Sequence, residues 1–557
     1  MKMFARGVVR CARLRSPAHS LKRATPGAQV VKRYSSTSAA AANTPAPAQS
    51  GASLLGSLTT ELDKISPRFE VEPEQIEILK TPSEFYETLK AKISTAQRRI
   101  YLSTLYIGKT EHELISVIWD ALQRNPKLKV SFLTDALRGT RETPEPSCAS
   151  LLAPLITEFG EDRVEIRMFH TPNLHGLRKK LIPKRINEGW GLQHMKLYGV
   201  DDELIMSGAN LSNDYFTNRQ DRYHVFHSAA IADYFARIHA AVCKLSYQIL
   251  PAPKDEPAGY TMSWPASNPS PSPLDDRHAF KRAASTLLTP LIRPSTPPPP
   301  SPFIRSSSSS LSTTTLIYPL LQFTPILPSS TDTSTELPAL TSLLTLLTQP
   351  AHHGSTWTFT AGYFNMTPHM RNLLLGSNPA RGTVIAASPR ANGFYGSPGV
   401  SGLLPPAYTH LAEVFLRAVE RAHLAARVRL MEWQRGSVGE PGGWTYHAKG
   451  LWVSSPPSPQ SRQHQQDRND NAPRPLPQVS LIGSSNYTAR SHALDLEANV
   501  LVVTRSPDLM RRLGDEEALL RAYARDVGWD EFAKVERRVG LHVRLAMGIV
   551  RVLGGAL

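Results

Sequence analysis

The stretch HMKLYGVDD, residues 194–202, has a histidine, a lysine two positions later and carboxylates at its end. Side chains alternate between the two faces of a β-strand, so His194 and Lys196 are expected to point the same way. A base beside a cation on one face indicates chemistry on an anionic group. A single H-x-K triplet carries little weight, because so short a pattern arises by chance in many sequences.

A second H-x-K triplet lies in the other half of the chain, at residues 447–449. From the first histidine to Asn210 is 16 positions, and from the second histidine to Asn486 is 39. The 23 extra positions equal the length of the polar, proline-rich stretch 455–477, which is predicted to be a disordered insert. Such an insertion costs little stability, because closure entropy grows slowly with loop length. Without it the two motifs superpose.

Each asparagine is followed 11 positions later by a carboxylate, Asp221 in the first half and Glu497 in the second. The halves differ at the end of the H-x-K motif, where Asp201 is matched by Ser454. We therefore expect Asp221 and Glu497 to hold the two imidazoles. Asp201 stays in the candidate catalytic set through its place in the motif, although a local structural role is the simpler interpretation.

The segments around these motifs alternate between strand and helix patterns in the same order in both halves. Predicted strands are 99–108, 129–137 and 163–170, then 355–367, 382–388 and 427–433, and predicted helices include 82–97, 113–124, 229–250 and 337–349. This order predicts an α/β fold with two pseudo-symmetric α/β/α lobes in one chain. We expect the active site at the interface between the lobes.

Composition divides the 557 residues further. We predict a mitochondrial transit peptide at 1–34, a disordered spacer at 35–66, the first lobe at 67–250, a low-complexity linker at 251–312 and the second lobe at 313–557. The first 60 residues hold nine Lys and Arg and no acid, which is typical of an import presequence. The alternative is a basic tail that binds nucleic acid. Without these residues the net charge falls from +16 to +7, so we expect no nucleic-acid partner.

Metal and membrane features are sparse. Beyond the presequence the chain has Cys148 and Cys243 alone, too few for a metal site or a disulfide framework, and we expect neither a metal nor another cofactor. No apolar run is long enough to span a membrane, so any membrane contact is expected to be peripheral. Two basic and apolar stretches are candidates for that contact, 175–185 and 541–553, and for the second a packed helix is the favoured interpretation.

The paired motifs resemble the phospholipase D superfamily, whose signature is H-x-K-x4-D followed by G-x-x-N or G-S-x-N. The first copy fits, and the second departs from the signature at Ser454. The longer stretches 191–223, 388–411 and 444–453 resemble mitochondrial phosphatidylglycerophosphate synthases, the CDP-diacylglycerol–glycerol-3-phosphate 3-phosphatidyltransferases. This likeness covers most of residues 66–550 outside the low-complexity inserts.

The resemblance implies a transferase that makes the precursor of phosphatidylglycerol and cardiolipin from CDP-diacylglycerol and glycerol 3-phosphate. It implies that His194 attacks phosphorus and that His447 assists departure of CMP, although the pseudo-symmetry allows the reverse. Lys196, Lys449 and the two asparagines would stabilise charge on the phosphoryl oxygens. An enzyme of this kind is expected on the mitochondrial inner membrane, at an anionic surface and on the matrix side.

Two other functions stay open at this stage, a hydrolase of the same superfamily (a phospholipase or a nuclease) and a non-catalytic protein that binds anionic lipid. Four arginines near the motifs are candidates for binding the acceptor phosphate, since a guanidinium makes bidentate contacts with phosphate. They are Arg138, Arg222, Arg390 and Arg490. Each alone is more simply interpreted as part of a structural ion pair.

Overall fold

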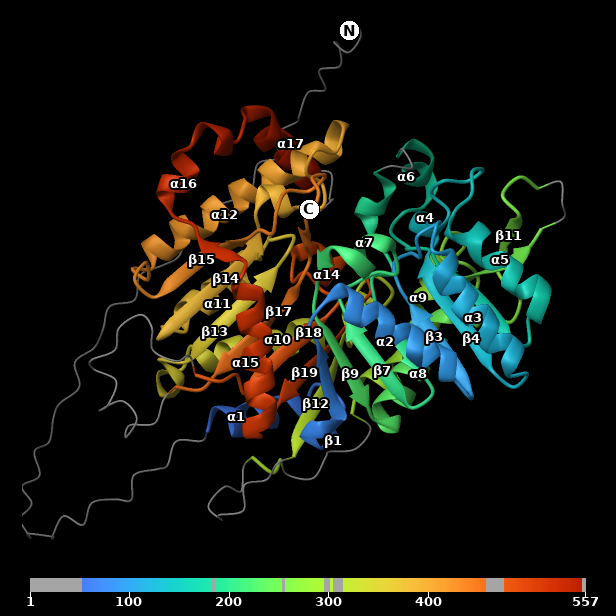
Figure 1. Cartoon of the computed structure of the whole chain (residues 1–557), viewed down its shortest axis with the longest axis horizontal. Coiled ribbons are helices and arrows are strands. Elements are labelled where there is room, and N and C mark those ends of the chain that lie inside the picture. Colours follow the sequence, from blue (N-terminus) through green and yellow to red (C-terminus); the bar gives the residue numbers. More distant parts are fainter. Residues whose placement is uncertain are drawn as a thin grey trace, which may run out of the picture. The chain divides into compact units, whose positions relative to one another are not determined.

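Two large mixed β-sheets lie side by side in the computed structural model (Figure 1). The structure describes residues 53–182, 186–252, 256–294, 301–303, 314–456 and 475–552. The insert predicted at 455–477 and the presequence predicted at 1–34 lie almost wholly outside these residues.

The first sheet has nine strands in the order β11-β10-β5-β4-β3-β6-β7-β9-β2. Their bounds in that order are Tyr260–Ser263, Tyr247–Pro251, Val164–Phe169, Lys129–Asp135, Arg99–Ser103, Leu197–Val200, Glu203–Ser207, Tyr223–His227 and Ile76–Leu79. Strands β3, β4 and β5 are parallel, and the others pair antiparallel.

The second sheet also has nine strands, in the order β1-β12-β19-β18-β17-β13-β14-β15-β20. Their bounds are Phe69–Val71, Thr315–Gln322, Glu497–Val503, Val479–Gly483, Lys449–Ser454, Thr356–Ala361, Arg381–Ala387, Val428–Trp433 and Ala524–Asp526. Its three parallel strands, β13, β14 and β15, take the places of β3, β4 and β5. The run β17-β18-β19-β12 repeats β6-β7-β9-β2, so the sequence repeat is a repeat of structure and the predicted α/β fold is confirmed.

Helices cover both faces of each sheet, as the apolar faces of sheets require. The longer ones are α1 (Leu54–Leu62), α2 (Pro82–Thr95), α3 (His112–Arg124), α5 (Cys148–Phe159), α8 (Ala229–Cys243), α9 (Arg277–Ile292), α10 (Glu336–Leu347), α11 (Pro368–Gly376), α12 (Leu404–Arg421), α15 (Pro507–Arg521) and α17 (Leu541–Val552). Shorter helices are α4 (Ala136–Gly139), α6 (Gly176–Leu181), α7 (Asn213–Thr217), α14 (Ala489–Ala493) and α16 (Trp529–Ala533).

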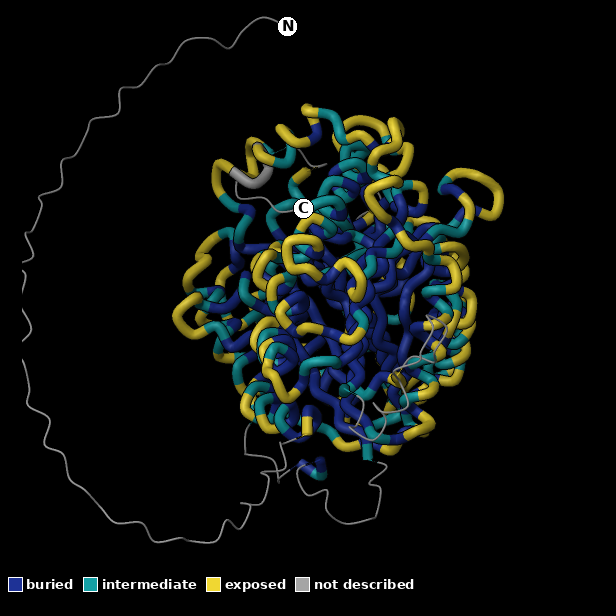
Figure 2. Tube along the Cα trace, turned by 90° about the vertical axis from the view of Figure 1, so that its left-hand side faces the viewer, coloured by how far each residue is buried: buried dark blue, intermediate teal, exposed yellow. Residues whose placement is uncertain are grey.

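The hydrophobic core has three parts. One lies under α2, α3 and α5 of the first lobe, and another under α1, α10, α11 and α12 of the second. The third joins the lobes, since it contains Met195 and Leu197 of the first copy together with Ala448 and Trp452 of the second. Figure 2 shows a buried interior with the exposed positions at the outside of the molecule. A continuous core beneath both motifs holds them at fixed positions relative to each other.

Three predictions about the borders of the lobes are wrong. Within the predicted spacer, α1 buries Leu55 and Leu58 against α10 of the second lobe, because its leucines recur at helical spacing. Strand β1 extends the second sheet rather than the first. The linker predicted at 251–312 contains β11 and the sixteen-residue α9, whose apolar face enters the central core.

The helix predicted at 229–250 ends early. It stops at Cys243, and residues 247–251 form β10, which pairs with β5, the outermost of the three parallel strands. The edge of a parallel sheet offers unpaired backbone groups, and these decide the conformation against local helical periodicity. No helix within the described ranges combines the length and apolar composition needed to cross a bilayer.

Candidate active site

The two H-x-K motifs enter equivalent strands of the two sheets, β6 and β17. Each histidine is also tied by its backbone to the other lobe. The His194 N–H donates to the Leu496 carbonyl at 3.0 Å, and the His447 N–H donates to the Gln220 carbonyl at 2.8 Å. A two-stranded ladder of β8 (Arg219–Gln220) and β16 (Thr445–Tyr446) reinforces the second contact. The lobes are therefore joined by main-chain bonds beside each catalytic candidate.

The carboxylates are exchanged between the lobes. Glu497 of the second lobe lies 3.0 Å from Nδ1 of His194, and Asp221 of the first lobe lies 2.6 Å from Nδ1 of His447. Both carboxylates are fully buried, and the Ser484 hydroxyl donates to Glu497. A carboxylate that accepts the Nδ1 proton fixes the tautomer and leaves Nε2 for chemistry. The expectation that these two residues hold the imidazoles agrees with this geometry.

The motif lysines lie beneath the histidines and are fully buried. Nζ of Lys196 donates to the carbonyl of His194 at 2.7 Å, and Nζ of Lys449 donates to the carbonyl of His447 at 2.8 Å. Lys449 also lies 3.7 Å from Asp221. Burial lowers the pKa of Lys196 to about 7 and that of Lys449 to about 8. An anionic phosphoryl group that enters between them would favour the charged form of both ammonium groups.

The two imidazoles differ in their access to the cavity. Burial, and then the neighbouring motif lysine, lowers the pKa of His194 and of His447 well below the ordinary value. Nε2 of His447 lies 3.3 Å from the hydroxyl of Tyr215, which also accepts a hydrogen bond from Asn210. Tyr215 is five positions after Asn210, and the residue five positions after Asn486 is Ser491, whose hydroxyl bonds to the Asn486 backbone and to Thr488 and, among the described residues, makes no hydrogen bond to His194. The His194 side chain is 11% exposed, against 4% for His447.

A cavity of about 400 Å³ lies over both histidines. Residues of both lobes line it: Leu105, Tyr106, Arg138, Arg141, Glu188, Leu192, His194, Asn210, Asp214, Tyr215, Arg219, Tyr363, Gly393, Phe394, Leu404, Tyr408, His447, Asn486, Thr488, Arg490, Ser491 and Asp495. Oδ1 of Asn486 is buried without a hydrogen-bond partner among the described residues, as suits a group that awaits a ligand. The predicted site at the lobe interface therefore has room for substrate.

Asp201 is not part of this cavity, which corrects its place among the catalytic candidates. It sits in the tight turn between β6 and β7 with a φ of 48°, and its carboxylate accepts from the backbone N–H groups of residues 97–99 at 2.8 to 3.1 Å. The Asp201 carboxylate therefore has a structural role, which is to cap the backbone at the start of β3. Ser454, its equivalent in the second lobe, bonds instead to the Pro475 carbonyl.

The four candidate arginines separate into two groups. Arg138 and Arg490 line the cavity. Arg222 is a core residue instead, since its guanidinium binds Glu516 at 2.8 and 2.9 Å and stacks on Trp452 at 3.8 Å. Arg390 lines a different cavity with Tyr523 and Arg537. Arg222 and Arg390 are therefore excluded from the acceptor site.

Several cavity residues were not predicted from the sequence, although the repeat contains a signal for them. Charged residues lie four and nine positions after each motif asparagine. They are Asp214 and then Arg219 in the first half, and Arg490 and then Asp495 in the second. Both are ion pairs, at 2.6 and 2.9 Å. Two tyrosines are equivalent as well. The residue after each motif lysine pairs with Ser103 in the first sheet and with Thr360 in the second, and Tyr106 and Tyr363 each lie three positions further on. The tyrosines and the exchanged ion pairs form the walls of the cavity.

Aromatic side chains of the second lobe gather at the cavity beside His447. Tyr363 stacks on Tyr408 with ring centroids 5.6 Å apart and touches Phe394 and His447. The described residues show no group of three or more His, Cys, Asp or Glu side chains arranged to hold a metal ion. The arrangement can perform phosphoryl transfer with one imidazole as nucleophile and the other as acid and base.

The chain was compared with known proteins. No protein-family profile matches it. The CDP-diacylglycerol–glycerol-3-phosphate 3-phosphatidyltransferase of Saccharomyces pastorianus is 44% identical over 512 residues, which cover 91% of this chain and 93% of that protein. The enzyme of Mus musculus, named mitochondrial, is 35% identical and covers 87% of this chain and 84% of its own length.

Among solved structures, phosphatidylserine synthase of Haemophilus influenzae covers 89% of this chain and 97% of its own with a TM-score of 0.63 and 19% identity. That likeness shows the fold, which is phospholipase D-like. The family is shown by the sequence identity to the two transferases, which extends over most of the chain. The chain is an enzyme and belongs to the CDP-diacylglycerol–glycerol-3-phosphate 3-phosphatidyltransferase family.

Proposed function

We propose that this phosphatidyltransferase works through a covalent phosphohistidine at His194. The family's reaction moves the phosphatidyl group from CDP-diacylglycerol to sn-glycerol 3-phosphate and releases CMP. The observation that carries the proposal is the exchanged pair of carboxylates, which orients both imidazoles toward one cavity. Two oriented imidazoles allow one to attack phosphorus while the other manages the proton.

In the first step Nε2 of His194 attacks the phosphorus that carries the diacylglycerol. A P–N bond forms, and the P–O bond to CMP breaks. His447 gives its Nε2 proton to the departing CMP oxygen. The low pKa of His194 keeps its lone pair available for attack. The pKa of His447, which must hold a proton, is raised by the negative diphosphate of the bound donor.

In the second step glycerol 3-phosphate takes the place of CMP. His447, now neutral, accepts the proton of the attacking hydroxyl, whose oxygen bonds to phosphorus as the P–N bond breaks. The products are phosphatidylglycerophosphate and free His194. Lys196, Lys449 and the amides of Asn210 and Asn486 stabilise the charge on the phosphoryl oxygens in both steps.

His194 is the better nucleophile on two grounds. Its Nε2 opens to the cavity, whereas Nε2 of His447 already contacts Tyr215. An imidazole held by a phenol is suited to exchange a proton with an oxygen, since the hydroxyl occupies the place where the leaving or attacking oxygen would lie. The asymmetry between Tyr215 and Ser491 thus favours one of the two roles that the pseudo-symmetry allows.

The transferase is tested with purified protein from about residue 35 onward, CDP-diacylglycerol in detergent and labelled glycerol 3-phosphate, with and without a chelator. We expect labelled phosphatidylglycerophosphate and CMP in equal amounts. CMP with phosphatidic acid and no labelled lipid would mean that water is the acceptor and that the chain is a hydrolase. A folded protein that gives no CMP at all would contradict the proposed attack of His194 on the donor.

The donor is a lipid, and we propose that α6 and α17 dock the protein on an anionic membrane surface. Leu177 and Leu181 of α6 are 74% and 76% exposed, and basic residues 178–180 lie between them. In α17, Leu541 and Leu545 are also exposed, while Val543 is buried and the helix packs on α12, so one face of it is free to meet a membrane. Figure 1 shows α6 and α17 on the same side of the two lobes. Basic and apolar side chains together suit the interface of an anionic bilayer.

The docking surface is tested with Leu177→Ser and Leu181→Ser together, and separately with alanine at Arg178, Lys179 and Lys180. The leucine variant is expected to lower binding to liposomes that contain anionic lipid by roughly 30-fold and the alanine variant by roughly 150-fold, since each buried leucine and each surface charge contributes on the order of 1 kcal/mol. Activity on donor dissolved in detergent should stay near the wild-type level. Leu337→Ser, on α10, is the matched control. Unchanged liposome binding would reject α6 as part of the surface.

We further propose a mitochondrial protein, peripheral on the matrix side of the inner membrane, without a nucleic-acid partner. The vertebrate relatives are named mitochondrial, and the first 60 residues of this chain have the composition of a presequence. The cysteines that the structure describes, Cys148 and Cys243, are both free and buried, as suits a reducing compartment.

A further inference from the structure

Arg138 stands apart from the other arginines of the reaction cavity. Three of them are neutralised by carboxylates, in the pairs Arg141–Glu188, Arg219–Asp214 and Arg490–Asp495. Arg138 lies over the ring of Tyr106, 4.3 Å from its centroid. Within the described part of the chain, its guanidinium has no carboxylate at salt-bridge distance. It is therefore the cavity guanidinium whose charge is available to a substrate anion.

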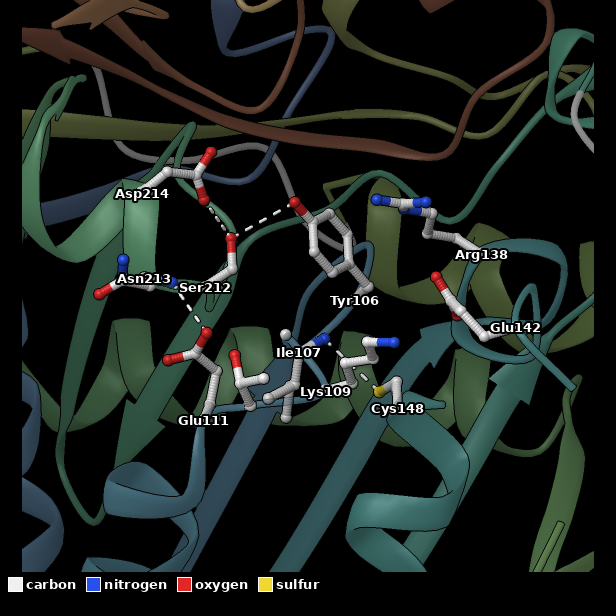
Figure 3. Close-up of a pocket in the computed structure, with 12 residues that line it drawn as sticks. Tyr106, Ile107, Lys109, Glu111, Arg138, Glu142, Cys148, Ser212, Asn213 and Asp214 are labelled. Atoms are coloured by element: carbon white, nitrogen blue, oxygen red, sulfur yellow. Dashed lines mark hydrogen bonds between the residues drawn. The ribbon is translucent and has the colours of Figure 1, made fainter. Parts of the chain in front are cut away.

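A second cavity of about 390 Å³ opens behind Arg138 (Figure 3). Tyr106, Arg138 and Asp214 line both cavities, so the two adjoin. Figure 3 shows Arg138 beside the Tyr106 ring, with Ser212 and Asp214 on the other side of that ring. Lys109 adds a second cation to the lining, and Glu111, Glu142 and Asp214 are its carboxylates. The volume suits a small polar molecule rather than a lipid.

The backbone fixes Arg138 relative to the nucleophile. Asp135 is fully buried at the end of β4, and its Oδ1 accepts from the backbone N–H of Arg138 at 3.0 Å. Its Oδ2 accepts from the N–H of Gln193, the residue before His194, at 2.9 Å. The Gln193 amide in turn donates to the Thr104 carbonyl, two residues before Tyr106. One buried carboxylate and one buried amide therefore set the positions of His194, Arg138 and Tyr106 together.

The second lobe has the same arginine without the same role. Arg138 is three positions past the end of β4, and Arg390 is three positions past the end of β14. Arg390 lines a separate cavity away from the histidines. The reaction of a phosphatidyltransferase is asymmetric, because it uses one acceptor. Of the two equivalent arginines, Arg138 alone lines the reaction cavity, which matches that asymmetry.

We infer that Arg138, supported by Tyr106, binds the phosphate monoester of the acceptor and makes the enzyme specific for glycerol 3-phosphate over unphosphorylated alcohols. The inference rests on the proposed function. In the proposed mechanism the donor phosphorus lies between the two histidines, where the motif lysines and asparagines stabilise its charge. The acceptor has one phosphate monoester of its own, at the other end of its three-carbon chain from the reacting hydroxyl. A planar guanidinium recognises such a group with two parallel hydrogen bonds.

The test compares Arg138→Gln with wild type in three assays: the KM for glycerol 3-phosphate, transfer to labelled glycerol at high concentration, and the burst of CMP without acceptor. We expect the KM for glycerol 3-phosphate to rise roughly 10- to 100-fold, the loss typical of a hydrogen-bonded charged contact. Transfer to glycerol and the CMP burst should stay within about 2-fold of wild type, since neither uses the acceptor phosphate. Arg138→Lys should lower the KM part of the way back to the wild-type value, because lysine restores the positive charge but not the two parallel N–H donors of the guanidinium.

Arg390→Gln is the matched control and should leave all three assays unchanged. A reduced CMP burst with a raised KM for CDP-diacylglycerol in Arg138→Gln would assign Arg138 to the donor and overturn the inference. Unchanged values in all assays would overturn it as well. Absence of a CMP burst from wild type would contradict the covalent mechanism alone, because the steady-state KM for glycerol 3-phosphate still decides the role of Arg138.

Discussion

His194→Ala is expected to lower phosphatidyl transfer by roughly 10⁴- to 10⁶-fold, the loss typical of removing an enzymatic nucleophile. It should also abolish every trace of lipid phosphate bound covalently to the protein. The reason is that Nε2 of His194 is the imidazole nitrogen that opens to the cavity, held in its tautomer by Glu497. His447 also has an orienting carboxylate, but its Nε2 contacts the Tyr215 hydroxyl.

The measurement uses CDP-diacylglycerol labelled at the lipid phosphate, mixed with enzyme without acceptor and denatured rapidly. Wild type should yield one labelled peptide, which contains His194. His447→Ala should form the same labelled peptide slowly and then fail to pass the label to glycerol 3-phosphate, since general acid–base catalysis is worth roughly 10²- to 10⁴-fold. Label on a peptide that contains His447 would reverse the two roles.

Glu497→Gln is expected to slow formation of the labelled His194 by roughly 10²- to 10⁴-fold, although Glu497 belongs to the other lobe. An amide can present its NH₂ to Nδ1 and so favour the tautomer with the proton on Nε2, which cannot attack. Asp221→Asn should likewise impair His447 and slow transfer to glycerol 3-phosphate. Rapid-quench rates of the two half-reactions measure each effect separately.

Asp201→Asn is the control for these variants, since it removes the carboxylate that completes the H-x-K-x4-D motif. Its side chain caps the backbone of residues 97–99, away from the cavity, so activity should stay within about 2-fold of wild type. A fall in stability of about 1 kcal/mol is expected from the weakened turn. A large loss of activity in a folded Asp201→Asn protein would contradict the assignment of the orienting role to Asp221 and Glu497.

The sequence by itself determined the repeat, and with it much of the site. Spacings of 11 positions from Asn210 to Asp221 and from Asn486 to Glu497 picked out the orienting carboxylates, because chemistry repeated in two halves keeps its offsets along the chain. Apolar periodicity found the strands β3, β4 and β5 and their equivalents, since a buried parallel sheet requires continuous apolar runs. The same patterns failed at β10, α1 and α9, where contacts with distant segments decided the conformation.

Only the tertiary structure decided which carboxylate serves which histidine. The exchange between lobes arises because the backbone before β6 pairs with Leu496 and the backbone before β17 pairs with β8, so that each imidazole meets the carboxylate that follows in the other lobe. Likewise, Arg138 and Arg390 are equivalent in the sequence, yet one faces the reaction cavity and the other does not. Offsets along a chain specify positions within a lobe, whereas the packing of the two lobes determines which side chains meet.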